Sequence, residues 1–312
     1  MADPWIVLAA AAIEGVVGYP DRLHARAPHP VAWLGAAIDA LERRWNRPER
    51  GAARRRVLGA VTVALTAGAA AGVGLFIERG VSDWALGAVV VAVLGAFGLA
   101  ARSLWDHVEA IVRPLSAGDL ILARRAVGRI VGRDVDGLDE AGVAAAALES
   151  LAESFNDGVV APLAWFLVGG LPGLFAFKAV STADSLIGHM EPRWRDFGWA
   201  AARADDLMNL VPARIAGGLI ALAAGRGWRT MLRDAPRHAS PNAGWPEAAM
   251  AGALGVRLGG PASYSGTLHD RPAFGEGPAP GADDLRRGVG VYLRACAVLA
   301  AALAIGGLAW PR

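Results

Sequence analysis

The sequence predicts an all-α, polytopic membrane protein with a polar cavity that opens to the cytoplasm, and three observations support this fold class. The chain of 312 residues is 54% hydrophobic with a mean hydropathy of +0.36, far more apolar than a soluble domain of this size. Its apolar runs are long and rich in Ala, Leu, Val and Gly, which is typical of membrane helices and not of membrane barrels. Acidic and amide side chains recur within them, and such groups face one another or water.

Charge and cysteine usage exclude several classes of protein. The 31 basic residues nearly balance the 29 acidic ones, so a nucleic-acid surface is not expected. Cys296 is the only cysteine, which excludes disulfides within the chain and cysteine-based zinc sites. The amino terminus lacks the basic region and cleavage pattern of a secretory signal. We therefore expect a single integral membrane domain over residues 1–312, in contact with the lipid bilayer.

The first 35 residues hold a short apolar segment and a loop. Residues 4–17 are interrupted by Glu14 and are shorter than the roughly 20 residues that cross a bilayer. Three prolines between residues 18 and 35 predict an irregular loop that carries His24 and His29. Histidines in such a loop are more often surface or capping residues than metal ligands.

Two spans are then predicted before a polar region on the cytoplasmic face. Residues 57–77 and residues 84–101 are uncharged for 21 and 18 positions. Seven arginines precede the first span and should lie in the cytoplasm: Arg43, Arg44, Arg47, Arg50, Arg54, Arg55 and Arg56. Residues 102–140 alternate charged and apolar positions, which predicts amphipathic cytoplasmic helices. A loop with Arg129, Arg133, Asp134 and Asp136 follows them; it could bind an anion, but we expect it to be solvated.

Residues 141–187 predict a helical hairpin with a polar set on each arm. Glu149 and Glu153 share a helical face with Asn156 or Asp157. Lys178 shares another face with Thr182 and Ser185, and Asp184 lies beside them. Glycines and a proline at residues 169–173 favour a turn between the two arms.

The charged residues of this hairpin cannot face lipid. A charge at the bilayer centre costs roughly 2.5–3.5 kcal/mol on insertion scales, so five of them would cost on the order of 15 kcal/mol. Ionisable groups inside spans mark a functional site by default; the alternative is a structural ion-pair network. Lys178 is also the single lysine among the basic residues, and its compact ammonium suits a phosphate oxygen or a carboxylate.

Residues 198–224 predict another helix, and the sequence leaves open whether its part from residue 207 crosses the membrane. Asp205 lies one turn from Asn209, while Asp206 shares a side with Arg203. The two aspartates with Asn209 could hold Mg²⁺, which takes a few carboxylates and leaves its other positions to water and phosphate. The alternative is a helix N-terminus that favours acidic residues because of its dipole.

The rest of the chain combines a polar loop region with a last span. Residues 225–288 are the longest polar region and contain a short predicted helix that begins at Pro246. Residues 289–310 form the final span. We find no internal repeat and no glycine-rich phosphate loop of the G-x-x-x-x-G-K-[ST] type.

Six blocks of sequence carry a resemblance to a known family: HPVAWLG at 29–35, GRD at 132–134, ESLAESFNDGVVAPL at 149–163, FKAVSTADSLIG at 177–188, GWAAARADDLMNLVPAR at 198–214 and SPNAGWPEAAMAGALG at 240–255. Over nearly its whole length the chain resembles the CobD/CbiB membrane family of cobalamin biosynthesis, the adenosylcobinamide-phosphate synthases. Four positions depart from the family's pattern and leave their own contacts open: Tyr19, Val135, Ser154 and Ser181.

The resemblance implies an ATP-dependent ligation at the cell inner membrane, with the active site facing the cytoplasm. The family joins a propionate of adenosylcobyric acid to the amine of (R)-1-amino-2-propanol or its O-phosphate, giving adenosylcobinamide or its phosphate. A carboxylate is a poor acylating agent, because its leaving group would be oxide or hydroxide. Phosphorylation must therefore first make a mixed anhydride, which calls for ATP, Mg²⁺ and a phosphate clamp.

We therefore give the polar side chains of residues 149–209 roles in this reaction, as a hypothesis. Mg²⁺ would be held by Asp205 and Asp206 together with Asp184 or Asp157. Glu149 or Glu153 would accept a proton from the attacking ammonium group, which must become a neutral amine.

The same hypothesis assigns other side chains to binding phosphate and substrate. Lys178 and Arg203 would neutralise phosphate charge, with Asn209 beside the metal. Asn242, Glu247 and the loop around His238 would close over the corrin amides or the aminopropanol.

Two other classes stay open on the residues alone. A Mg²⁺-dependent membrane prenyl- or phospho-transferase also places paired carboxylates in a helical cavity. A non-catalytic transporter or membrane regulator uses intramembrane carboxylates to relay protons or ions. The sequence also leaves open whether protomers form a homo-oligomer.

Overall fold

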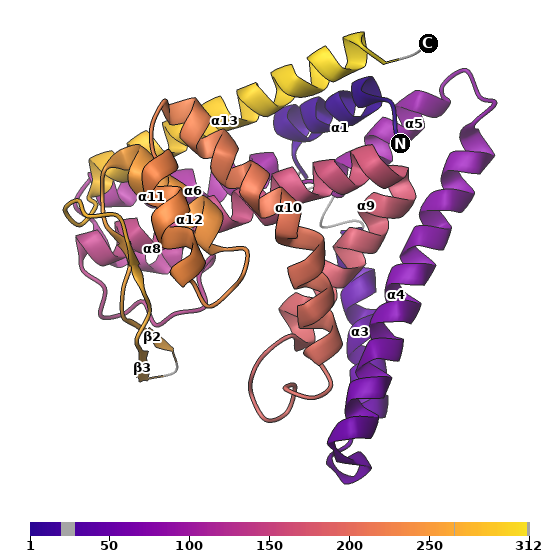
Figure 1. Cartoon of the computed structure of the whole chain (residues 1–312), viewed down its shortest axis with the longest axis horizontal. Coiled ribbons are helices and arrows are strands. Elements are labelled where there is room, and N and C mark those ends of the chain that lie inside the picture. Colours follow the sequence, from indigo (N-terminus) through magenta and orange to yellow (C-terminus); the bar gives the residue numbers. More distant parts are fainter. Residues whose placement is uncertain (20–28, 265, 311–312) are drawn as a thin grey trace. The chain divides into compact units, whose positions relative to one another are not determined.

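The computed structural model describes residues 1–19, 29–264 and 266–310, and the chain is 73% helical with only short strands (Figure 1). This confirms the predicted all-α class. The chain divides into two compact units. The expected single domain over residues 1–312 stays a prediction.

The first unit comprises Met1–Ala100, Ala161–Asn209 and Leu303–Arg312. Its helical elements are α1 (Pro4–Val17), α3 (Pro30–Trp45), the 3₁₀ turn η1 (Pro48–Arg50), α4 (Gly51–Val81), α5 (Gly87–Ala96), α9 (Ala161–Ile187) and the first part of α10 (Trp199–Ala224). Helices α4 and α9 form its most extensive packing, and α3 and α5 also pack against both of them. Apolar side chains from α3, α4, α9 and α10 form a buried cluster around Ile38, Val63, Ala183 and Phe197.

A glycine breaks α9 within the predicted turn at residues 169–173. Gly170 has φ 64° and ψ −157°, a backbone region that is essentially restricted to glycine. The N–H of Leu171 then donates to Oε1 of Glu78 on α4 at 2.6 Å, so a carboxylate caps the second half of α9. Pro172 needs no hydrogen-bond partner for its nitrogen in this first turn. The predicted turn is therefore a sharp break between two helical segments.

Ion pairs and hydrogen bonds attach the loop after α9 to α3 and α4. Arg193 donates to Oε2 of Glu42 at 2.9 Å. Arg56 pairs with Asp196 at 3.0 Å, and Arg55 donates to Asn46 at 2.7 Å. Some of the arginines predicted to lie in the cytoplasm therefore also fix the fold at this end of the unit.

The second unit comprises Ala101–Val160 and Leu210–Ala302. It holds α6 (Ala101–Ser116), α7 (Leu120–Val127), α8 (Glu140–Phe155), the π-helix η2 (Asn156–Val160), the rest of α10, α11 (Trp228–Asp234), the 3₁₀ turn η3 (Ala235–Arg237), α12 (Gly244–Leu254) and most of α13 (Ala282–Leu308). Two antiparallel pairs, β1 (Leu258–Gly259) with β4 (Ala273–Phe274) and β2 (Ala262–Tyr264) with β3 (Thr267–His269), lie within the predicted polar loop region.

Helix α8 is the centre of this unit. It packs against α6, α7, α12 and β1, and its alanine-rich middle is buried on every side. The small side chains let the neighbouring elements approach closely, so a polar group in this helix is shielded from solvent.

Several sequence expectations need correction. The predicted span at residues 84–101 overlaps the apolar helical stretch Gly87–Ser116, but a non-helical turn at 97–100 separates α5 from α6 within it. The predicted loop at 18–35 gives way to α3 at Pro30; His24 lies outside the described residues. His29 caps α3, because its Nδ1 accepts from the N–H of Val31 at 3.3 Å. Helix α10 continues through Pro212 as one helix of 26 residues.

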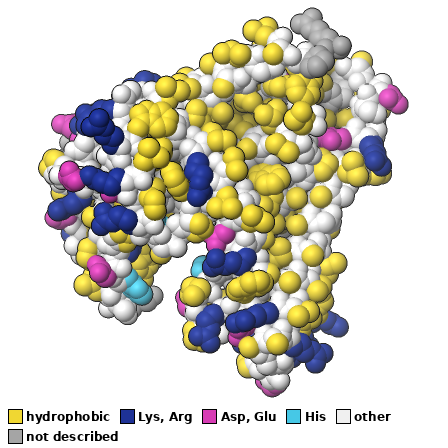
Figure 2. All heavy atoms as spheres, in the orientation of Figure 1, with side chains coloured by type: hydrophobic (Ala, Val, Ile, Leu, Met, Phe, Trp, Pro, Cys, Tyr) yellow, Lys and Arg dark blue, Asp and Glu magenta, His cyan; other side chains and the backbone are white. Residues whose placement is uncertain are grey.

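The protein is a multi-pass membrane protein. Within the described residues, five helical stretches are long and apolar enough to cross a bilayer: Pro48–Val81, Gly87–Ser116, Glu140–Ile187, Trp199–Ala224 and Ala282–Leu308. Large apolar side chains on α4, such as Leu65 and Phe76, are exposed, as expected for a surface that faces lipid. Figure 2 shows hydrophobic side chains over much of the face drawn, and Lys and Arg side chains gathered near the η1 end of α4.

Candidate functional site

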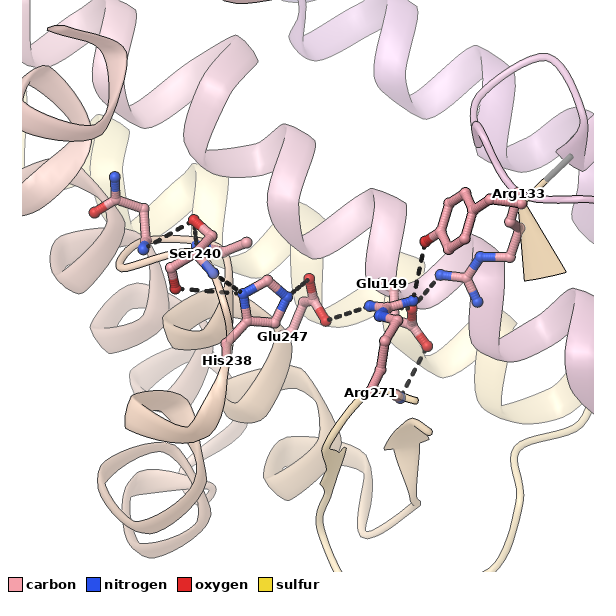
Figure 3. A network of polar contacts seen from close by, with 10 residues as sticks. Arg133, Glu149, His238, Ser240, Glu247 and Arg271 are labelled. Atoms are coloured by element: carbon pink, nitrogen blue, oxygen red, sulfur yellow. Dashed lines mark hydrogen bonds and ion pairs between the residues drawn. The ribbon is translucent and has the colours of Figure 1, made fainter. Parts of the chain in front are cut away.

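Helix α8 places the Glu149 carboxylate in the buried centre of the second unit, with its side chain only 3% exposed. Oε2 contacts the guanidinium group of Arg133 and lies 3.3 Å from Nη2 of Arg271. Oε1 accepts from the backbone N–H of Gly259 at 2.9 Å. Both oxygens of Glu149 are therefore engaged, as the close-up in Figure 3 shows.

Local structure fixes the two arginines on either side of Glu149. Arg133 lies in the loop before α8, where the neighbouring Asp134 accepts from the N–H of Gly266 at 2.8 Å and from the Ser263 hydroxyl. The backbone N–H of Asp134 also donates to the carbonyl of Ser263 at 2.8 Å. The chain then returns through β3 and brings Arg271 to the same carboxylate. The β2–β3 pair thus holds together two parts of the sequence that lie far apart.

Glu247 on α12 is the second buried carboxylate of this cluster. Its side chain is 3% exposed, with Oε2 at 3.8 Å from Nη2 of Arg271 and Oε1 at 3.7 Å from Nε2 of His238. Within the described residues Oε2 has no hydrogen-bond partner, and an unsatisfied buried oxygen is costly unless a donor reaches it. Burial, and then the nearby charges of Glu153 and Glu149, raise the pKa of Glu247 well above its ordinary value.

His238 presents a proton towards Glu247. Its Nδ1 accepts from the backbone N–H of Ser240 at 2.8 Å, so the neutral ring carries its proton on Nε2. Burial lowers the pKa of His238, which favours this neutral form. The Ser240 hydroxyl oxygen accepts from the amides of Asn242 and Ala243, as in a helix-capping turn. Since Ser240 binds His238 through its backbone, these residues do not form a serine nucleophile with its base.

We call Arg133, Glu149, His238, Glu247 and Arg271 the buried ion cluster. With Glu247 protonated, its two guanidinium groups and the Glu149 carboxylate leave one excess positive charge; with Glu247 ionised, the cluster is neutral. Pairing each buried ion with an opposite charge avoids the larger cost of an uncompensated charge in this interior.

The first unit holds the other predicted site residues. Arg203 pairs with Asp206 at 3.1 Å, which confirms that they share one side of α10. Asp184 on α9 lies close enough to Asp206 and Arg203 to interact electrostatically with both. Two of the three predicted metal ligands thus approach each other from different helices.

The third predicted metal ligand is engaged within α10. Oδ2 of Asp205 accepts from the Asn209 amide at 3.0 Å, which confirms the predicted pairing of these two residues. In the part of the chain that the structure describes, no three His, Cys, Asp or Glu residues are grouped as a metal site. A metal role for Asp184, Asp205 and Asp206 stays a prediction.

Lys178 lines an apolar cavity of about 370 Å³ formed by α3, α4, α5 and α9. It is the only charged residue lining the cavity among those described, and its neighbours there include Trp33, Phe97 and Phe175. Its contact with phosphate stays a prediction.

The predicted catalytic residues are thus divided between the two units. Glu153 is exposed on α8 and acts on Glu247 electrostatically. Asp157 accepts from the Asn156 amide at 2.7 Å within η2, and π-helical turns are frequent at functional sites. The predicted polar cavity that opens to the cytoplasm stays a prediction.

Sequence reasoning missed two members of the buried ion cluster. The loop with Arg133 was expected to be solvated, but its side chain is 13% exposed and paired with Glu149. Arg271 lies in a Pro- and Gly-rich stretch with no helical periodicity to indicate its direction. The available signal was the need for cations opposite Glu149 and Glu247, and this does not select among 31 basic residues.

Fold and site together define a multi-pass helical membrane protein with a buried ion cluster. The CobD/Cbib protein family matches residues 7–292, and the chain belongs to this family. It is 47% identical to the "Cobalamin biosynthesis protein CobD" of Rhodobacter capsulatus over 98% of both chains. It is 46% identical to the protein of that name from a Sinorhizobium species over 95% of both. No solved structure matches the chain. The family supports a role in cobalamin biosynthesis.

Proposed function

We propose that the protein is an ATP-dependent amide ligase. It would join adenosylcobyric acid to (R)-1-amino-2-propanol or to its O-phosphate at the cell inner membrane. The observation that carries this proposal is the buried Glu247 carboxylate, one oxygen of which has no hydrogen-bond partner among the described residues. Membership of the cobalamin-biosynthesis family supports the choice of a corrinoid substrate.

Glu247 is the proton acceptor in this proposal. An amine attacks only as the neutral base, so a carboxylate near it must take up its proton. The pKa of Glu247 is raised by burial and by Glu153 and Glu149, which brings it closer to the pKa that suits a base at neutral pH. Oε2 is the atom at which the amine N–H would donate.

Glu149 takes a positioning role in place of the proton-accepting role that the sequence suggested. Its oxygens are occupied by Arg133, Arg271 and the N–H of Gly259. It holds Arg271 at 3.8 Å from Glu247. Once Glu247 is protonated, Arg271 and Arg133 retain an excess positive charge that would stabilise a developing oxyanion.

The donor set of the first unit fits Mg²⁺ with phosphate. Mg²⁺ in nucleotide sites is usually held by one or two carboxylates and completes its shell with phosphate and water. Asp184 and Asp206 would provide these carboxylates, and the interaction between them is the like-charge contact that a cation relieves. Arg203 would neutralise phosphate charge. ATP would supply the phosphoryl group that converts a carboxylate oxygen into a leaving group.

The exposed arginines of the first unit support a cytoplasmic orientation for one end of α4. Arg43, Arg44, Arg47 and Arg54 are exposed near η1, at one end of the long span of α4. Such clusters are retained in the cytoplasm. The η1 end would therefore face the cytoplasm, where ATP is available.

A product assay tests the proposal. Detergent-purified protein is incubated with adenosylcobyric acid, ATP, Mg²⁺ and either amine, and the product is identified by mass. We expect an amide with loss of water relative to the two substrates, and consumption of ATP. A corrinoid that returns unchanged with both amines, from protein whose folding is verified, would rule out the ligase.

A further inference from the structure

The geometry points to a phosphate-binding site in the arginine-lined cavity between α7 and the loop before α8, specific for a small phosphate monoester. The cavity measures about 390 Å³ and is lined by Arg124, Arg125, Arg129 and Asp136, with Ile121 and Val135 on its apolar wall. It lies wholly within the second unit and shares no lining residue with the buried ion cluster. The inference does not depend on the proposed ligation.

The guanidinium groups of Arg124, Arg125 and Arg129 have no carboxylate partner among the described residues. Within the described chain none of them forms an ion pair with a carboxylate, whereas sixteen ion pairs are formed elsewhere in it. Arg124 makes one hydrogen bond, from Nε to the carbonyl of Leu138 at 2.6 Å, which orients its remaining N–H groups. Arg125 and Arg129 are exposed and line the same cavity.

A simpler explanation for the position of these arginines is that arginine favours the C-terminus of a helix. Two of the three do lie in the last turn of α7, where they complement the helix dipole. However, the last carbonyls are already satisfied by the chain that follows. Gly128 donates to the carbonyl of Arg124 at 3.0 Å, and Arg129 donates to that of Ala126 at 3.2 Å. Arg129 itself lies beyond the helix, so the dipole does not explain why it lines the cavity.

Charge and size select the ligand class. Three guanidinium groups and the Asp136 carboxylate give the cavity walls a net charge of +2. A phosphate monoester carries about −1.5 to −2 at pH 7 and has three acceptor oxygens, and arginine binds such oxygens in bidentate pairs. The volume is at the small end of the roughly 300–1,000 Å³ typical of ligand pockets, which suits a short organic group against Ile121 and Val135 and excludes a tetrapyrrole.

Two sources could supply this chemistry: a soluble phosphate ester, or the headgroup of a lipid such as phosphatidic acid. Calorimetric titration of the full-length protein in neutral detergent at pH 8 uses inorganic phosphate and glycerol 1-phosphate for the first source. Neutral phosphatidylcholine nanodiscs with and without phosphatidic acid probe the second. We expect saturable binding that weakens as salt is added, because the cavity is open to solvent.

Substitutions in the cavity wall should change phosphate affinity in opposite directions, depending on the charge they remove. Arg125→Gln and Arg129→Gln each remove a charge-assisted contact and should weaken phosphate binding about tenfold. Asp136→Asn removes the one repelling carboxylate and should tighten binding at least about twofold. Arg229→Gln, an exposed arginine of α11, is the matched control and should leave binding unchanged. Since Arg125, Arg129 and Asp136 are exposed, the variants should fold, and size-exclusion profiles verify this.

The outcomes separate clearly. Binding of glycerol 1-phosphate with these opposite effects supports a soluble ester; binding only to phosphatidic acid, with the same effects, supports the site and assigns it to a lipid. Absence of binding to every probe, or binding that is equal in wild type and the Arg125→Gln/Arg129→Gln double variant, overturns the inference.

Discussion

Nη2 of Arg271 lies 3.8 Å from Oε2 of Glu247, and the same nitrogen lies 3.3 Å from Oε2 of Glu149. One guanidinium group thus stands next to two carboxylates that are both 3% exposed. Two buried carboxylates without a cation would repel each other in a medium that screens poorly. The arginine therefore has a structural role, and it also adjusts how tightly Glu247 holds a proton.

Replacing Arg271 tests this structural role. Arg271→Gln leaves Glu149 with fewer partners and should destabilise the protein by about 3–5 kcal/mol, the usual cost of breaking a buried ion pair from one side. Thermal unfolding in detergent measures the change. Adding Glu149→Gln should restore part of the loss, because it removes the charge that Arg271 compensated. If the losses of the two single variants simply add in the double variant, Glu149 does not depend on Arg271.

Glu247 should make stability depend on pH. The pKa of Glu247 is raised in the folded protein. The contribution of Glu247 to the free energy of unfolding is therefore fully present below the pKa that this residue has in the unfolded chain, and it is lost as pH rises through the pKa in the folded protein. Glu247→Gln should remove this dependence and make the protein more stable than wild type at high pH. Unfolding curves between pH 4 and pH 9 measure the difference. Glu276→Gln, at a side chain that is 81% exposed, should leave the profile of the wild type unchanged.

The same substitution should affect the proposed reaction. If Glu247 accepts the proton of the amine, Glu247→Gln should lower the ligation rate by about 10²–10⁴-fold while the protein remains folded. A higher pH should partly compensate in the variant, because more of the amine is then neutral. A rate within threefold of wild type would assign the proton to another group, with Glu153 as the next candidate.

Asp234 should make stability depend on pH in the opposite direction to Glu247. Its carboxylate is buried, pairs with Arg233 at 2.8 Å and accepts from the N–H of Gly275 at 2.9 Å. The hydrogen bond from Arg233 holds the pKa of Asp234 below its ordinary value, although burial opposes this. Its stabilisation is present above the pKa of the unfolded chain and is lost as pH falls through the folded value.

Asp234→Asn should therefore cost about 1–3 kcal/mol at neutral pH and progressively less in acid. Asn retains an oxygen for Gly275, and Arg233 is half exposed, so the loss should be smaller than for Arg271→Gln. Urea unfolding at pH 7 and pH 3 compares the two conditions. An equal loss at both pH values would show that packing, and not charge, is what the substitution removes.

The sequence predicted the fold class, because apolar length and charge placement are local properties of the chain. It also singled out Glu149, since a carboxylate inside an apolar run has to find a partner, whereas Glu247 entered only through the family resemblance. It could not identify that partner, because Arg271 is 122 residues from Glu149 along the chain and lies in a stretch without periodicity. The break between α5 and α6 was missed for a similar reason: residues 97–100 are uncharged and carry no proline.

The position of the turn in α9 could be predicted from the sequence, but the contact that caps the following helical segment could not. Glycines and a proline at 169–173 indicate a break, yet only the structure shows that Glu78 of α4 caps the new helix at Leu171. Such a cap depends on tertiary packing, which local sequence does not encode. The strands at 258–274 were also missed, since they are two or three residues long.

Gly170→Ala should destabilise the first unit for two independent reasons. At φ 64° and ψ −157° an L-residue is strained, at a cost of about 1–3 kcal/mol. A Cβ there would also lie 2.4 Å from Oε1 of Glu78, which would displace the carboxylate that accepts from Leu171. Glu78→Ala isolates the second effect and should cost about 1 kcal/mol, typical of a lost helix cap. Thermal unfolding should therefore rank Gly170→Ala below Glu78→Ala, while Gly169→Ala, with nothing within 4 Å of its Cβ, should be close to wild type. Equal stability of the Gly170 and Gly169 variants would mean that the break does not require this backbone conformation.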